Sequence, residues 1–116
     1  SLTLHAQGCL PSGITFSNQQ QVDNFATNYP GCSEILGDVT ISYWIDDLLG
    51  LSQIISINGD LNINWGSPAN LQGLNNLINV GGKVEINTGT LENFSGLGSL
   101  ETIGGRLDIS DNSCLL

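Results

Sequence analysis

Apolar residues along this chain recur in blocks with a fixed internal pattern. In each block a short alternation of apolar and polar residues, such as Leu61-Asn62-Ile63, follows an Asn-Gly or Gly-Gly pair and a segment whose apolar residues are spaced by three. Alternation with period two predicts a strand with one buried side, and spacing by three predicts a bent segment or a short helical turn. Each block therefore predicts one strand and a short second side.

The blocks are copies of one another at a step of 23 residues, and a degenerate copy over residues 35–41 precedes the first by 22. One such unit cannot bury its apolar side alone, so the units are expected to stack around a shared core with parallel strands. The columns that keep the step are Gly50, Gly73 and Gly96; Gly59, Gly82 and Gly105; Leu61, Val84 and Leu107; and Ile63, Ile86 and Ile109.

This pattern divides the chain into three expected segments. Residues 35–116 are expected to form a β-rich solenoid, which begins another coil after Ile109 and then ends, so truncation or a partner is expected there. Residues 7–34 are expected to form an N-terminal cap, because the bare end of a stack exposes its core and its unpaired strand edge. Residues 1–6 read as the remnant of a signal peptide cleaved after Ala6.

The N-terminal cap is expected to contain one short amphipathic helix within residues 14–29. Ser17 can cap it, and Gln20 occupies the reciprocal capping position. Pro30-Gly31 stops it. The apolar residues at spacings of three and four on one face are Val22, Phe25 and Ala26.

Composition and charge narrow the function classes. The 116-residue chain has a formal net charge of −9, and Lys83 and Arg106 are its only basic residues. Neutralising several phosphates needs many more cations, so nucleic acid is excluded as a partner, and anionic membrane surfaces are disfavoured. No stretch approaches the roughly 20 apolar residues of a membrane span, so no membrane insertion is expected.

Three cysteines indicate an oxidising environment. A Cys9–Cys32 disulfide would close a short loop in an exported protein, and the alternative is three buried thiols in a cytosolic one. Cys114 would then be free, or its partner would lie beyond this chain. The cysteines form no pair or cluster with zinc spacing, so no metal is expected.

The motif Leu-x-x-Ile-Gly-Gly-x-Leu-x-Ile, present at residues 100–109, resembles the receptor L-domain-like variety of leucine-rich repeat over about residues 35–112. Residues 9–16, 29–32 and 37–41 look like the start of secreted repeat proteins from Bacteroidetes. The resemblance implies a right-handed parallel β-solenoid of about 23-residue leucine-rich-like coils, on the cell surface or outside the cell. It brings no shared catalytic residues or cofactor. The chain keeps the family's Asn-x-Leu step imperfectly, which favours a flatter coil than a horseshoe.

Polar strand positions that point outward form the first candidate binding surface, because solenoids commonly bind partners on a sheet face. The alternative is a solvated face whose opposite charges pair between strands, such as Asp60 with Lys83. The three outward columns are Asp38, Asp60, Lys83 and Arg106; Thr40, Asn62, Glu85 and Asp108; and Ser42, Asn64, Asn87 and Ser110. The candidate binding residues among them are Asn62, Asn64, Glu85, Asn87 and Asp108.

Three aromatic residues, Tyr43, Trp44 and Trp65, follow the first two strands and form the second candidate surface. Exposed aromatic rings stack on sugars or anchor protein partners, and the alternative is packing over the coil corners.

These features predict a secreted or cell-surface binding or adhesion module that recognises a glycan or a protein. One alternative is a structural subunit that self-associates end to end through its C-terminal coil. A polysaccharide-active enzyme is a further, disfavoured alternative, because His5 is the only histidine and no Ser/His/Asp set forms without it.

Overall fold

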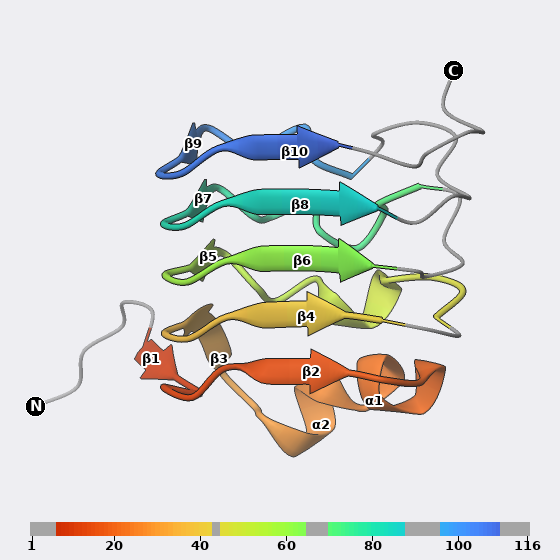
Figure 1. The fold of residues 1–116 in the computed structure, drawn as a ribbon. Coiled ribbons are helices and arrows are strands. Elements are labelled where there is room, and N and C mark those ends of the chain that lie inside the picture. The colour runs from red at the N-terminus through yellow and green to blue at the C-terminus, as the bar shows by residue number, and fades with distance from the viewer. Residues whose placement is uncertain (1–6, 43–44, 65–69, 88–95, 110–116) are drawn as a thin grey trace, which may run out of the picture.

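The computed structural model describes residues 7–42, 45–64, 70–87 and 96–109, and within them the chain passes back and forth between two parallel sheets of five strands each (Figure 1). The first sheet, in the order β1-β3-β5-β7-β9, consists of β1 (Gln7–Cys9), β3 (Cys32–Ile35), β5 (Ser56–Ile57), β7 (Asn79–Val80) and β9 (Thr102–Ile103). The second sheet, in the order β10-β8-β6-β4-β2, consists of β2 (Ile14–Phe16), β4 (Val39–Ile41), β6 (Leu61–Asn64), β8 (Val84–Asn87) and β10 (Leu107–Ile109). The helical elements are α1 (Gln19–Asp23), α2 (Phe25–Asn28) and the 3-10 turn η1 (Leu49–Leu51).

The expected right-handed β-solenoid with one capping helix is wrong. The described residues form a small α/β structure with two open parallel sheets and two short α-helices. Each repeat contributes a second strand, such as β5 or β7, where the spacing of apolar residues by three predicted only a bent side. Those strands are only two residues long, which is too short to show a periodicity in the sequence. Their backbone pairing with the neighbouring repeats defines them as strands.

The register between repeats follows the columns read from the sequence. Leu61 pairs with Val84, and Ile63 pairs with Ile86. Leu107 pairs in turn with Val84, which continues the 23-residue step to β10. All pairings between neighbouring described strands of both sheets are parallel, as expected.

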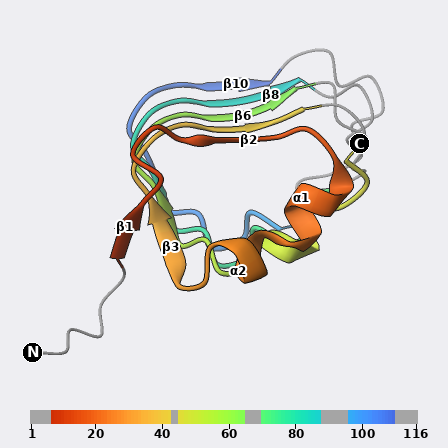
Figure 2. The same ribbon diagram turned by 90° about the horizontal axis from the view of Figure 1, so that it is seen from below.

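The core lies between the second sheet and the bent segments opposite it, with the first sheet closing one side (Figure 2). Its buried side chains come from the columns that alternate with polar positions. Along β6 and β8, for example, each buried residue is followed by a half-buried one. The largest fully buried side chains are Phe16, Phe25, Ile35, Ile41, Ile45, Leu48, Leu51, Ile54, Ile57, Leu61, Ile63 and Leu71.

The corner between the two sheets is held by aspartates and shaped by glycine. The Asp38 carboxylate accepts the Asp60 backbone N–H at 2.8 Å, and the Asp60 carboxylate accepts the Lys83 backbone N–H at 2.9 Å. A Cβ at Gly82 would overlap the Asp60 carboxylate, so a larger residue there would displace this bond. The Asp38 and Asp60 corners thus each supply a hydrogen-bond acceptor to the next repeat, which otherwise would leave a backbone donor unpaired.

The N-terminal helical segment differs from its expected form in two ways. Asn18, not Ser17, caps α1, because its side chain accepts the Gln21 N–H at 2.9 Å. Gln21, not Gln20, supplies the reciprocal bond, accepting the Ser17 N–H. The segment also breaks into two helices at Asn24.

The apolar face of this segment is only partly as expected. Val22 and Phe25 are buried, as predicted, while Ala26 is exposed. Gly31 follows α2 with a φ of 78°, a left-handed conformation that glycine adopts freely, and the segment stops there as the Pro30-Gly31 pair predicts.

Candidate functional site

The outer side of the second sheet carries two rows of polar side chains, which we call the polar face. The rows are in register, because Thr40 pairs with Asn62 and Glu85 pairs with both Asn62 and Asp108. Every member is half-buried. Adjacent strands lie about 4.8 Å apart, so the rows form a flat, regularly spaced array. The polar face consists of Thr40, Asn62, Glu85 and Asp108 in one row and Ser42, Asn64 and Asn87 in the other.

The side-chain amides of the polar face keep unused hydrogen-bonding capacity. No side-chain hydrogen bond joins Asn62 or Asn64 to another described residue. The Asn87 Oδ1 atom is buried and has no hydrogen-bond partner within the described part of the chain. Each amide therefore offers donors or acceptors that the described residues leave to water or to a ligand.

The outer row of the first sheet is different. Asn79 donates to the Ser56 Oγ at 3.3 Å, and its own Oδ1 accepts from the Thr102 hydroxyl. These side chains satisfy one another along the row, so they hold neighbouring strands together. This row of the first sheet therefore serves stability, whereas the amide groups of the polar face make no such bonds between strands.

The outward column that contains Asp38, Asp60 and Lys83 does not belong to the polar face, although the sequence suggested that it would. The Asp38 and Asp60 carboxylates bond the backbone of the following repeat, so they serve the corner. Lys83, which directly precedes β8, forms an ion pair with Glu85 of that strand, at 3.4 Å between Nζ and Oε1, whereas the alternative of a solvated face paired it with Asp60. Both side chains are partly exposed, so this pair contributes about 1 kcal/mol or less.

The predicted aromatic cluster of Tyr43, Trp44 and Trp65 lies outside the described residues, as do Ser110, Cys114, His5 and the proposed signal-peptide remnant. The other five candidate binding residues all lie on the second sheet, and the structure brings them together on the polar face.

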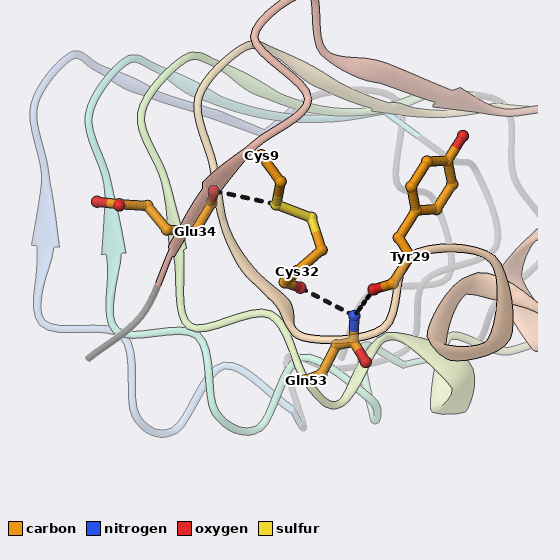
Figure 3. Close-up of a disulfide and its surroundings, with 5 residues drawn as sticks. All are labelled: Cys9, Tyr29, Cys32, Glu34 and Gln53. Carbon is orange, nitrogen blue, oxygen red and sulfur yellow. Dashed lines mark hydrogen bonds between the residues drawn. A yellow bond between two sulfur atoms is a disulfide. The ribbon is translucent and has the colours of Figure 1, made fainter. Parts of the chain in front are cut away.

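A disulfide joins Cys9 of β1 to Cys32 of β3, as predicted, with their Cα atoms 5.7 Å apart (Figure 3). The Gln53 side-chain amide lies beside it and donates to the carbonyls of Tyr29 and Cys32, both at 2.9 Å. The Cys9 sulfur also lies 3.3 Å from the Glu34 carbonyl oxygen. The disulfide and Gln53 together fix the N-terminal segment to the first two repeats.

Sequence reasoning missed a hollow of about 220 Å³ beside β2. Residues of β2, α1 and α2 and the residue after α2 line this hollow. These residues share no sequence motif, because only the packing of the two helices beside β2 brings them together. Its lining residues are Ile14, Thr15, Phe16, Gln21, Asn28 and Tyr29.

Two further observations bear on the class of site. Among the described residues no three carboxylate, imidazole or thiol side chains gather where they could hold a metal ion. None of the described helices has the length and apolar character needed to cross a bilayer.

Comparisons of the chain with protein-family models, with curated proteins and with solved structures give no match. The resemblance to receptor L-domain-like repeats therefore rests on the sequence motif alone. The polar face is the structural feature that bears on function.

Proposed function

We propose that this chain is an exported recognition module that binds a glycan through the polar face. The observation that carries the proposal is the unused amide hydrogen-bonding capacity of Asn62 and Asn64 on a flat sheet surface, beside the Glu85 and Asp108 carboxylates. Amides offer both donors and acceptors, and carboxylates accept from hydroxyl groups. A polyhydroxylated chain is the ligand class that meets such a repeating array.

Export is part of the same proposal. The Cys9–Cys32 disulfide is compatible with an oxidising compartment, where such bonds form and persist. The receptor L-domain-like motif supports an extracellular or cell-surface location.

The test is a glycan array with the full chain, followed by calorimetric titration of the strongest binders. Replacing Asn62 and Asn64 together with alanine should weaken binding by a factor of about 5 to 150, because two amides that contact the ligand each contribute about 0.5–1.5 kcal/mol. The matched control is Asn58→Ala, which removes the same side chain from an exposed position outside the polar face. Equal binding by all three proteins would overturn the assignment of the polar face.

Trp65→Ala separates the polar face from the aromatic candidates, since it leaves Asn62 and Asn64 in place. A larger loss with Trp65→Ala than with the asparagine pair would move the site to the aromatic residues. Binding of a protein and of no glycan would replace the ligand class while keeping the surface.

A second candidate function is a self-assembling structural subunit. Leu107 is 54% exposed and Ile109 is 37% exposed, although the residues in their columns one repeat earlier are buried. Concentration-dependent oligomers, with no glycan or protein ligand bound by the polar face, would favour this function over recognition.

A further inference from the structure

The first row of the polar face continues onto the edge strand of the second sheet. Thr15 of β2 pairs in register with Thr40 of β4, and its side chain is exposed. The row then runs through Asn62, Glu85 and Asp108, each of which pairs with the member before it. The five strands lie one above another and nearly parallel, so these five residues form one straight row, which we call the long row (Figure 1).

The backbone determines the spacing of this array in two directions. Adjacent strands are about 4.8 Å apart, so polar groups recur at this distance along the long row. The second row, Ser42, Asn64 and Asn87, lies two residues further along its strands, roughly 6.6 Å away. A ligand that lies along the rows meets a new pair of polar groups at every strand. A ligand that lies along one strand would meet only one such pair.

The linkage of a glycan determines whether it can follow a straight row. In a β-1,4-linked hexopyranose chain both glycosidic bonds leave the ring equatorially, so the chain is an extended, flat ribbon. One residue of this ribbon is about as long as the spacing of adjacent strands, and hydroxyl groups project from both of its edges. An α-1,4-linked chain has one axial bond at each residue and curls into a helix. The rows of the polar face therefore favour the β-1,4-linked ribbon.

The charge of the polar face favours a neutral ribbon. Glu85 and Asp108 both lie on the long row. Lys83 pairs with Glu85 at 3.4 Å, and no ion pair within the described part of the chain neutralises Asp108. The chain as a whole has a formal net charge of −9. A polyuronate or a sulfated glycan would place its own anionic groups against these carboxylates, and like charges repel.

We propose that the polar face binds a neutral β-1,4-linked glycan as an extended ribbon that crosses the strands, with one sugar residue on each strand. The long row bonds the hydroxyl groups on one edge of the ribbon, and the Asn64 and Asn87 amides bond those on the other edge. The inference rests on the proposed glycan binding. It adds the linkage, the charge and the direction of the ligand.

Calorimetric titration with hexasaccharides of β-1,4-linked glucose, mannose and N-acetylglucosamine tests linkage and charge. At least one of the three should bind. Maltohexaose has the same composition as cellohexaose with α-1,4 linkages, and it should bind at least about tenfold more weakly than the best of the three. The hexamer of β-1,4-linked mannuronate should be weaker by a similar factor, because it carries a carboxylate on every residue.

A length series and one isosteric variant test the direction. With the best sugar, the dissociation constant should fall about three- to tenfold for each residue added between two and five, because each residue meets another strand. Thr40→Val removes one hydroxyl from the strand beside Asn62 and keeps the branched shape. It should weaken binding of the hexasaccharide about three- to tenfold. The matched control is Thr102→Val on the outer row of the first sheet, where the hydroxyl donates to Asn79, and it should leave binding unchanged.

Four results would each overturn the ribbon. They are no binding of any neutral β-1,4-linked hexasaccharide, equal binding of maltohexaose or of the mannuronate hexamer, an affinity that does not rise beyond the disaccharide, and normal binding by Thr40→Val. If another glycan still binds and the paired alanine variant of Asn62 and Asn64 loses it, the proposed function stands and only the linkage or direction is wrong. If no glycan binds at all, both proposals fail. Circular dichroism on every variant verifies that it is folded.

Discussion

The first and the last described layers of the core differ in how they are covered. In the first layer Phe16 and Phe25 pack edge to face, with ring centroids 5.5 Å apart, and both are buried. In the last described layer Leu107 and Ile109 occupy core columns and are exposed. A layer of a parallel repeat buries its apolar side chains only where another element covers it. Here the two short helices and the Cys9–Cys32 disulfide cover the first layer.

The largest expected effect of a single substitution is at the covered end. Phe25→Ala should lower the free energy of unfolding by about 3–5 kcal/mol, because Phe25 is fully buried and packs on both Phe16 and Tyr29. Urea unfolding followed by circular dichroism measures it. Tyr29→Ala is the control, since Tyr29 is 38% exposed and should cost less. Equal losses for the two variants would show that Phe25 does not carry the covering layer.

The disulfide at the same end gives the next effect. Replacing Cys9 and Cys32 together with alanine should lower the free energy of unfolding by about 3 kcal/mol, because the bond closes a loop with a sequence separation of 23 residues. Urea unfolding without reductant measures the loss. Cys114→Ala serves as the control and should leave stability unchanged. If the double variant were as stable as the parent chain, Gln53 and the helices would suffice to hold the N-terminal segment.

A smaller effect is expected at the corners, and it declines toward the later repeats. Asp60→Ala should cost about 1–2 kcal/mol, since the Lys83 backbone N–H loses a charged acceptor. Lys83→Ala, at the equivalent position one repeat later, should cost less than about 1 kcal/mol because only a partly exposed ion pair is lost. Thermal unfolding of both variants compares them directly. A larger loss for Lys83→Ala would contradict the role given to the aspartate corner.

The sequence predicted those parts of the structure that a regular column determines. The register of Leu61, Val84 and Leu107 follows from a constant step, and the pairing of Cys9 with Cys32 was also predicted. The first sheet was missed because Ser56–Ile57 and Asn79–Val80 are too short to show a period, and their strand character comes from pairing with each other. Pairing across repeats is not encoded in any one segment.

The candidate site was predicted only in part, for a related reason. Alternation places Asp60 and Asn62 on the same side of the strand, and it cannot tell which side chain turns back to bond the backbone. The structure shows that the aspartate does so, while the Asn62 amide stays on the outer surface of the sheet. Short polar side chains compete for nearby backbone groups, and that competition depends on the neighbouring repeat.

The smallest expected effect on stability is at β10. Leu107→Ala should lower the free energy of unfolding by less than about 1 kcal/mol, since more than half of this side chain is already in water, whereas Leu61→Ala in the same column should cost about 2–5 kcal/mol. Urea unfolding of both variants at the same protein concentration makes the comparison. Equal losses for the two leucines would mean that Leu107 is covered in solution, and the contrast between the first and the last described layers of the core would then be lost.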